Sequence, residues 1–243
     1  MVVGAPGPVA LVTGAAGGIG AACARALAEQ GYRLALADLK PPAPAGGVTA
    51  ALSLGFDVSN DTEVGDALAA VAAELRQLDL VVHGAGQVGK GPLVAVSADE
   101  WRRLIDVNLS SAFFLARHAH PLLAANRGSM VLVSSTNGLN GGSALSGPAY
   151  AVAKAGIINL TRYLAKEWAV DGIRVNCLAP GPVDTPMLDR IGDEQLAALI
   201  EAVPLKRMAR ADEVAATVCY LASPQAAYLT GTVHNISGGL VLD

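Results

Sequence analysis

The sequence predicts a doubly wound α/β fold in which a mainly parallel sheet of seven strands is flanked by helices. Short, uniformly apolar runs alternate with longer stretches of helical periodicity. Strands without polar alternation suit a parallel sheet covered on both faces, and their alternation with helices requires crossover connections. The composition agrees, because 52% of the 243 residues are hydrophobic and only 16% are charged, which allows a large buried core.

Seven apolar runs are the predicted strands, and they cover residues 9–12, 33–37, 52–56, 80–82, 130–133, 174–178 and 232–236. Ser97 and Glu100 form a capping-box pattern, which predicts the start of a helix that runs to about residue 124. The proline-rich segment 41–47 is short and separates two predicted strands, so a surface loop is favoured over a domain linker. No repeat or domain boundary is visible, and residues 1–243 are predicted to form a single domain.

Charge and metal-ligand patterns argue against several classes of protein. The net charge is −4 at pH 7, and Lys and Arg are scattered, so a nucleic-acid partner is not expected. Cys23, Cys177 and Cys219 are far apart in sequence, which indicates neither a disulfide framework nor a metal knuckle. His118 and His120 are two positions apart and would point to different faces of a helix, so no metal site is predicted.

The N-terminal segment lacks the pattern of an export signal. Pro6 and Pro8 interrupt it, and a glycine-rich turn follows almost at once. No apolar stretch reaches the roughly 20 residues that a membrane-spanning helix needs. We therefore expect a cytoplasmic protein without a membrane partner.

A glycine-rich turn, Thr-Gly-Ala-Ala-Gly-Gly-Ile-Gly at residues 13–20, joins the first predicted strand to a helix. Gly14, Gly18 and Gly20 would let backbone N–H groups and the positive helix end approach a pyrophosphate. An isolated motif of this kind is equally consistent with a turn that binds nothing. Its position between strand and helix favours dinucleotide binding.

Asp38 ends the second predicted strand, eighteen positions after Gly20. A carboxylate there can accept hydrogen bonds from the adenosine ribose and repel a 2′-phosphate, so NAD is predicted as the cofactor. Lys40 lies close by and weakens that argument. Asp57, after the third strand, is predicted to face the adenine amine, although a turn or helix-capping role is nearly as well supported.

Tyr150 and Lys154 are four positions apart, so on a helix they share one face. An unperturbed tyrosine titrates at about 10, too high for efficient acid/base catalysis at neutral pH. We expect the Lys154 ammonium, together with an oxidised nicotinamide, to lower the pKa of Tyr150.

The glycine turn, Asp38, Asn108, Ser135, Tyr150, Lys154 and Pro180-Gly181 together resemble the short-chain dehydrogenase/reductase family, and the resemblance covers nearly the whole chain. It implies a Rossmann fold and a catalytic tetrad. Tyr150 would exchange the proton, Lys154 would hold the nicotinamide ribose, Ser135 would bond the substrate oxygen, and Asn108 would anchor a water relay. Ser135 is chosen over Ser134 by the Ser-x-x-Gly spacing that ends at Gly138.

The resemblance also implies a cofactor-binding set: Gly14, Ala16, Gly18, Ile19, Gly20, Asp38, Asp57, Val58, Gly84, Tyr150, Lys154, Pro180, Gly181, Val183 and Thr185. Residues from about 185 to 205 should form a mobile lid over the substrate. Met187, Leu188 and Ile191 would line that lid, or would belong to an ordinary amphipathic helix.

The sequence departs from the family pattern at two places. Ser135 precedes Tyr150 by fifteen positions, about two more than usual, which predicts an insertion in the 140–147 loop over the substrate pocket. His83 replaces an asparagine that normally braces the sheet, and a structural role for this histidine is favoured over a catalytic one.

The predicted function is NAD-dependent interconversion of a secondary alcohol and a ketone. Two alternative functions are a 3-oxoacyl-thioester reductase and a non-catalytic dinucleotide-binding regulatory protein. Such reductases usually prefer NADPH, and Asp38 argues against that preference. The substrate is a small molecule of unspecified class, and its candidate contacts are Gln87, Asn137, Asn140, Leu145, Pro182 and Met187. The resemblance further implies a homotetramer.

Overall fold

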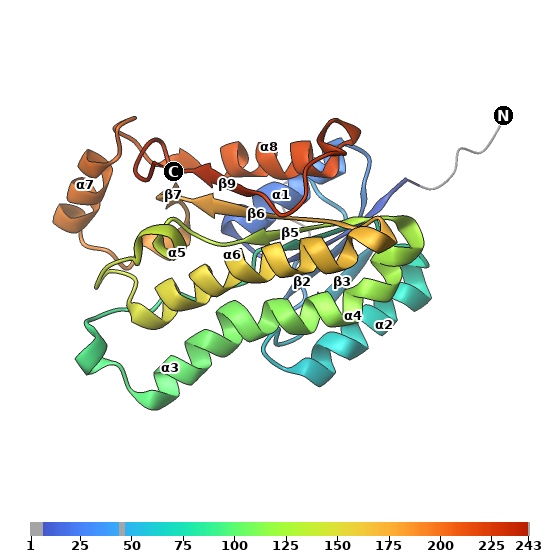
Figure 1. Ribbon diagram of the computed structural model, residues 1–243, viewed down its shortest axis with the longest axis horizontal. Helices are drawn as coiled ribbons and strands as arrows, with labels where there is room; N and C mark the ends of the chain where they lie inside the picture. The colour runs from blue at the N-terminus through green and yellow to red at the C-terminus, as the bar shows by residue number, and fades with distance from the viewer. Residues whose placement is uncertain (1–6, 44–46, 243) are drawn as a thin grey trace.

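The computed structural model describes residues 7–43 and 47–242, in which seven parallel strands form one central sheet (Figure 1). In chain order the strands are β1 (Val9–Thr13), β2 (Arg33–Asp38), β3 (Leu52–Gly55), β4 (Leu80–His83), β5 (Ser129–Val133), β6 (Arg174–Pro180) and β9 (Val233–Ile236). All seven coincide with the predicted apolar runs to within about two residues at each end. The predicted α/β fold is confirmed.

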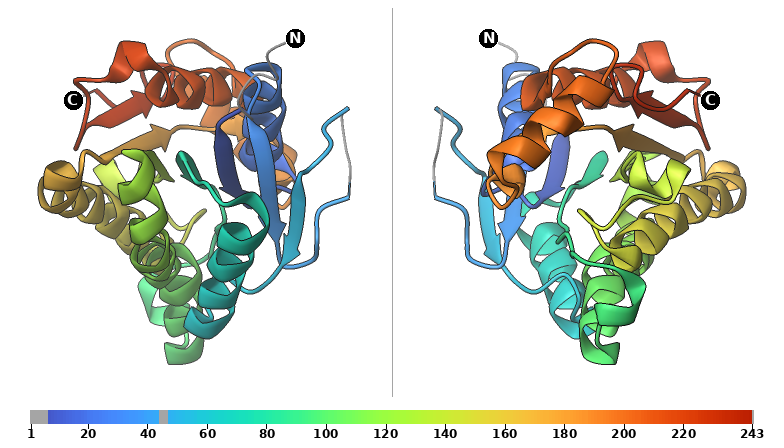
Figure 2. Two further views of the ribbon diagram at one scale, coloured as in Figure 1. Left: turned by 90° about the vertical axis from the view of Figure 1, so that its right-hand side faces the viewer. Right: turned by 90° about the vertical axis from the view of Figure 1, so that its left-hand side faces the viewer.

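Helices cover both faces of the sheet (Figure 2). One apolar core lies between the sheet and the helices α1 (Gly18–Glu29) and α8 (Ala211–Ala222). The other lies against α2 (Asp61–Leu75), α4 (Ser111–Asn126) and α6 (Pro148–Trp168). The five inner strands are almost wholly buried because helices shield them on both sides, which explains their uniformly apolar sequences. The edge strands β3 and β9 are partly exposed.

The strand order β3-β2-β1-β4-β5-β6-β9 contains one reversal of direction, between β1 and β4. The chain first moves outward from β1 to β3 and then returns to the other side of β1. Ligands of open α/β sheets bind at such a switch point, outside the carboxyl ends of the strands. The topology therefore directs attention to the segments that follow β1, β4 and β5.

The helix predicted from Ser97 to about residue 124 has an unexpected irregularity. The Ser97 hydroxyl accepts a hydrogen bond from the Glu100 N–H at 3.1 Å, and the helix α3 (Ala98–Ile105) begins as predicted. A π-helical turn, Asp106–Ser110, then separates α3 from α4. Within it the Asn108 amide donates to the Leu104 carbonyl at 2.9 Å, so a side chain satisfies backbone that the distortion disturbs.

The predicted lid contains a short 3-10 turn (Pro186–Leu188) and the helix α7 (Asp193–Ala202). It lies between β7 (Val183–Asp184) and β8 (Ala209–Arg210), which pair as a separate two-stranded sheet. Across the parts of the chain that the structure describes, no helix is both long and apolar enough to cross a membrane. Pro6 and residues 44–46 of the predicted 41–47 loop lie outside the described residues.

Candidate active site

A cavity of about 850 Å³ opens at the carboxyl ends of the central strands. Most of the site residues predicted from the sequence line it: Gly14, Gly18, Ile19, Gly20, Asp38, Asp57, Val58, Gly84, Gln87, Ser135, Asn137, Leu145, Tyr150, Lys154, Pro180, Gly181, Pro182, Val183, Thr185 and Met187. The other three, Ala16, Asn108 and Asn140, lie outside its lining. Asn140 is exposed, and its side-chain oxygen accepts a hydrogen bond from the Gly142 N–H at 2.9 Å. A local turn thus uses that oxygen, and the substrate contact of Asn140 stays a prediction.

The glycine turn forms a cradle that side chains would fill. A Cβ on Gly20 would lie 2.1 Å from the Gly14 carbonyl oxygen, and Gly14 and Gly18 have positive φ angles of 70° and 53°. Helix α1 starts at Gly18 without a side-chain cap and without an acidic residue in its first turn. The N–H groups at the start of α1 therefore have no side-chain acceptor. Free N–H groups and the positive end of the helix dipole would stabilise an anion bound at this turn.

The two carboxylates predicted to contact adenosine are held by local hydrogen bonds. Asp38 accepts from the Ala16 N–H at 3.0 Å and from the Leu39 N–H at 2.8 Å. Asp57 accepts from the N–H and the hydroxyl of Ser59 at 2.8 and 2.7 Å, which is the turn role that the sequence had offered as an alternative. Both carboxylates nevertheless line the cavity. Ala16, outside the lining, thus contributes a backbone donor that orients Asp38.

Tyr150 lies in the first turn of α6 and is 8% exposed. Burial raises the pKa of Tyr150, while the Ser135 hydroxyl and the Arg190 guanidinium act in the opposite direction. The Ser135 hydroxyl oxygen also accepts a hydrogen bond from the Asn137 N–H at 3.1 Å, which orients it. Ser135 and Tyr150 are therefore brought together although fifteen residues separate them.

Lys154 is 5% exposed, and its ammonium donates to the Val133 carbonyl at 2.8 Å. Its Nζ lies over the Tyr150 ring, 5.6 Å from the centroid, and burial lowers the pKa of Lys154 to about 8. Arg190 is the cation that opposes the rise in the pKa of Tyr150 in this structure. The lowering expected from Lys154 together with an oxidised nicotinamide stays a prediction. Ser134 donates to the Lys154 carbonyl at 2.6 Å and so supports the helix that carries Lys154.

Asn108 is fully buried in the π-helical turn. Its amide donates to the Gln87 carbonyl at 2.7 Å and its oxygen accepts from the Gln87 N–H at 3.2 Å, which fastens the segment after β4 to the helix. A Cβ on Gly86 would lie 2.7 Å from Asn108 Oδ1 and 3.4 Å from Lys154 Nζ. Asn108 and Lys154 therefore approach the same glycine.

His83 is buried at the end of β4 and does not line the cavity. Its Nδ1 lies 2.8 Å from the Thr13 hydroxyl, and its Nε2 lies 3.0 Å from the Ser111 hydroxyl. Burial lowers the pKa of His83 to about 3, with a smaller contribution from Lys154 in the same direction. The neutral ring joins β1 to α4, in agreement with the structural role inferred for it.

Sequence reasoning missed two arginines of the cavity, Arg103 on α3 and Arg190 in the predicted lid. Arg103 donates to the Gln87 side-chain oxygen, and Arg190 Nη2 donates to the Leu145 carbonyl at 2.6 Å. The bond to Leu145 joins the lid to the predicted insertion at 140–147. One signal was present, since Arg190 is the single basic residue between positions 186 and 205 of the sequence.

Comparisons with known proteins agree on one family. The family model described as Enoyl-(Acyl carrier protein) reductase matches residues 14–241. The chain is 38% identical to cis-4-hydroxycyclohexanecarboxylate dehydrogenase of Sinomonas cyclohexanicum over 241 residues, 95% of each chain. It is 35% identical to 3-oxoacyl-(acyl-carrier-protein) reductase of Escherichia coli strain K12 over 244 residues, which cover 97% of this chain and 98% of that protein.

The solved structure of ligand-free aldohexose dehydrogenase from Thermoplasma acidophilum is similar with a TM-score of 0.88 at 29% identity, covering 96% of this chain and 93% of that one. The matches extend over the sheet, the glycine turn and the lid alike. The chain therefore belongs to the short-chain dehydrogenase/reductase family of oxidoreductases, whose cofactor is a nicotinamide dinucleotide.

Proposed function

We propose that this protein is an NAD-dependent dehydrogenase that interconverts a secondary alcohol and a ketone. One observation carries the proposal: Tyr150, Ser135 and Lys154 line the same cavity as the glycine turn and Asp38. Hydride transfer coupled to proton transfer needs a dinucleotide cradle and an acid/base group at one site. The names of the Sinomonas and Thermoplasma relatives, a hydroxycyclohexanecarboxylate and an aldohexose dehydrogenase, support the oxidation of an alcohol.

The residues around the turn fit a dinucleotide. The three glycines remove the Cβ atoms that would fill the cradle, and the start of α1 has unpartnered N–H groups for a pyrophosphate. Asp38, Asp57 and Val58 would hold the adenosine end, and the nicotinamide end would contact Gly84, Pro180, Gly181, Val183 and Thr185. When bound, NAD supplies the hydride acceptor, a chemistry that no side chain of the chain provides.

Tyr150 is the proposed acid/base group. During oxidation its phenolate accepts the proton of the substrate hydroxyl, and during reduction its hydroxyl returns that proton to the carbonyl oxygen. Ser135 donates a hydrogen bond to the same substrate oxygen and polarises it. Burial outweighs the opposing effects of Ser135 and Arg190, so the pKa of Tyr150 is raised overall. Formation of the phenolate would therefore depend on the positive charge that an oxidised nicotinamide adds beside it.

Lys154 and Asn108 complete the proposed tetrad as positioning residues. With a pKa of about 8, the Lys154 amine is mostly charged at neutral pH and can hold ribose hydroxyls of the cofactor. The approach of Asn108 and Lys154 to Gly86 supports a water relay between them. Glycine at this position leaves the room that such a relay needs.

Asp38 is the basis for proposing NAD over NADP. Its carboxylate ends β2 and is oriented by the Ala16 N–H, where it can accept hydrogen bonds from ribose hydroxyls. The glycine turn contains no Arg or Lys to bind a 2′-phosphate. An added phosphate would therefore meet an uncompensated negative charge.

The test is a steady-state assay of purified protein with NAD or NADP and a panel of secondary alcohols, polyols and hydroxy acids, followed by the absorbance of the reduced cofactor. Turnover with NAD and an alcohol is the expected result. Turnover restricted to NADP(H) would contradict the cofactor assignment. Absence of turnover with every alcohol and ketone, although calorimetry shows that NAD binds, would contradict the proposed activity.

A second candidate, reduction of a 3-oxoacyl thioester, is favoured by the 35% identity to the Escherichia coli reductase. It uses the same tetrad in the reductive direction. A 3-oxoacyl thioester offered with NADH and NADPH separates the two candidates. Higher kcat/KM for that thioester than for any ketone would favour the reductase.

We also propose that the protein assembles as a homotetramer. Helix α6 packs beside the helix formed by α3 and the π-helical turn, which α4 continues (Figure 1). Phe113 on α4 and Val152 on α6 are about half exposed, an apolar surface that a second copy would cover. Light scattering coupled to size-exclusion chromatography tests the proposal, and a monomeric mass would refute it.

A further inference from the structure

Charge is distributed unevenly among the residues that line the cavity. The acidic residues of the lining are Asp38 and Asp57, both at the proposed adenosine end. The cations of the lining are Lys154, Arg103 and Arg190. Lys154 already has a place in the proposed tetrad and is bonded to β5, whereas neither arginine has been assigned a contact with the substrate.

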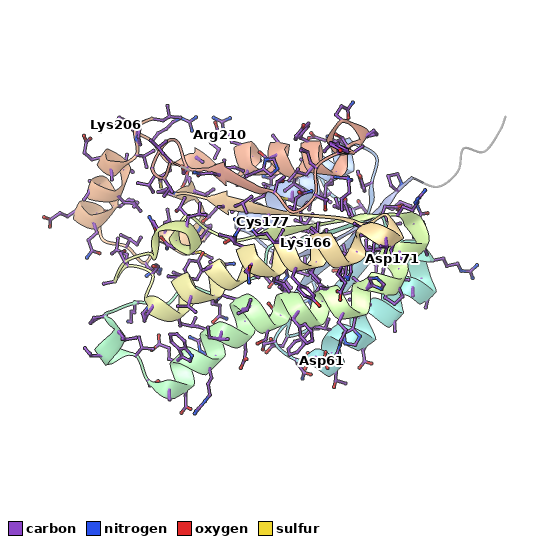
Figure 3. The ribbon with its side chains drawn as sticks, viewed as in Figure 1. Asp61, Lys166, Asp171, Cys177, Lys206 and Arg210 are labelled. Carbon is purple, nitrogen blue, oxygen red and sulfur yellow. The ribbon has the colours of Figure 1, made fainter. Side chains whose placement is uncertain are left out.

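The cations that directly follow the lid in sequence are paired with carboxylates. Lys206 contacts Glu201 at 2.6 Å, and Glu213 contacts Arg207 at 2.8 Å and Arg210 at 3.7 Å. Figure 3 labels Lys206 and Arg210 above α7 and α8, on the outer side of the molecule. These cations have intramolecular counter-charges.

Arg103 and Arg190 differ from them. Within residues 7–43 and 47–242, neither guanidinium has a carboxylate oxygen within 4.0 Å. Arg190 Nη2 donates to the Leu145 carbonyl, and Arg103 Nη1 donates to Gln87. A guanidinium has five N–H donors, so each arginine retains donors for a ligand.

Arg190 is the better placed of the two to act on a substrate. It lies between the 3-10 turn of the lid and α7, and its bond to Leu145 holds it across the cavity. Its charge also reaches the reacting group, because Arg190 partly opposes the rise that burial causes in the pKa of Tyr150. Apart from Thr185, the rest of the lid surface in the cavity is apolar and consists of Pro186, Met187, Leu188, Ile191 and Leu199, with Leu240 from the C-terminal segment.

We infer that the substrate is a hydroxy acid or keto acid with an apolar skeleton, and that Arg190 binds its carboxylate. The inference rests on the proposed function and extends it to a substrate class. Arginine suits the task because its planar fork can donate two parallel hydrogen bonds to a carboxylate. The apolar lid residues would pack against the skeleton, and Arg103 supplies a second positive charge in the same cavity.

The experiment compares paired substrates on the 243-residue protein. A homologous series of hydroxy acids, each with the hydroxyl on the penultimate carbon, is offered with NAD beside the corresponding methyl esters. We expect kcat/KM to favour the acid over its ester by about 10- to 100-fold at the best chain length. Arg190→Gln should abolish that preference mainly through KM, Arg190→Lys should keep part of it, and Arg103→Gln should weaken it less.

Arg102→Gln is the matched control, because Arg102 neighbours Arg103 on α3 but pairs with Asp99 outside the cavity lining. It should leave the preference unchanged. Equal kcat/KM for acids and esters in the native protein would overturn the inference. A raised KM for NAD in Arg190→Gln, with the acid preference intact, would also overturn it and assign the arginine to the cofactor.

Calorimetric titration of the same acids and esters, without turnover, keeps the two proposals apart. Binding of the acids that Arg190→Gln abolishes, without NADH formation from any compound, would refute the proposed function and leave the anion site standing. Turnover of acids and esters at equal efficiency would refute the anion site and leave the function standing. Neither turnover nor Arg190-dependent binding would overturn both.

Discussion

The cofactor end and the substrate end of the cavity are built from different parts of the fold. At the cofactor end, the glycine turn and Asp38 directly follow or end the neighbouring strands β1 and β2, and one hydrogen bond of 3.0 Å joins Ala16 to Asp38. At the substrate end, the 140–147 loop and the lid meet through the bond from Arg190 to Leu145, 45 positions apart. The first end carries carboxylates and the second carries arginines.

In this fold, therefore, the segments proposed to bind the cofactor are separate from those proposed to select the substrate. Strand ends are fixed by the ladder of the sheet, so a turn between them presents the same backbone geometry whatever the substrate. Loops carry fewer such constraints and can change length and charge without disturbing the core. Tyr150 and Ser135 lie where the two ends meet.

The largest effect is expected at that meeting point. Tyr150→Phe removes the acid/base hydroxyl and should lower kcat by about 10²- to 10⁴-fold, because general acid/base catalysis contributes in that range. NAD affinity, measured by calorimetry, should change by less than about threefold, since the turn and Asp38 are untouched. Tyr228→Phe is the control, because Tyr228 is fully exposed and should retain full activity. Near-normal turnover by Tyr150→Phe would remove the tyrosine from the reaction.

Gly20→Ala tests the rigidity of the cofactor end. The new Cβ would lie 2.1 Å from the Gly14 carbonyl oxygen, so backbone must move, and we expect a loss of about 1–3 kcal/mol in the free energy of unfolding together with weakened NAD binding. Urea denaturation and calorimetry measure the two effects. Gly192→Ala is the matched control, because no atom lies within 4 Å of its Cβ and its φ is −68°. Equal stability and equal NAD affinity in both variants would show that the turn tolerates a side chain.

Asp38→Asn sharpens the electrostatic contrast between the two ends. Removing the charge should lower the ratio of kcat/KM for NAD to that for NADP by about 10- to 100-fold, because the repulsion of a 2′-phosphate is lost. Asp57→Asn should change this ratio less, since Ser59 occupies one of its carboxylate oxygens. An unchanged ratio in Asp38→Asn would mean that another residue selects the cofactor.

The smallest effect on activity is expected at His83, which supports the sheet and lies outside the cavity. The pKa of His83 falls from 6.5 to about 3 on folding, so between these values the unfolded chain binds more protons than the folded one. The free energy of unfolding should therefore decrease as the pH falls below about 6.5, with a contribution of at most about 1.4 kcal/mol per pH unit from this residue. In His83→Asn that contribution disappears, so the stability curves of the two proteins should converge or cross toward low pH. Parallel curves from denaturation at several pH values would contradict the buried neutral histidine.

Features that depend on local pattern were predictable. The strands follow from uniformly apolar runs, and the shared face of Tyr150 and Lys154 follows from their spacing on a helix. Ser135 was selected over Ser134 by its spacing to Gly138. In the structure the buried Ser134 hydroxyl donates a hydrogen bond to the Lys154 carbonyl. The π-helical turn at Asn108 was not predictable, because the surrounding sequence has an ordinary helical period.

The substrate end required the folded chain. Nothing near Arg190 in the sequence indicates that it contacts Leu145 or acts on Tyr150. Neighbours in sequence determine turns, caps and periodic faces through short-range hydrogen bonds and burial. Contacts between distant loops form only when the sheet and its helices have packed. Those contacts determine the charge of the cavity and, with it, the substrate that we propose.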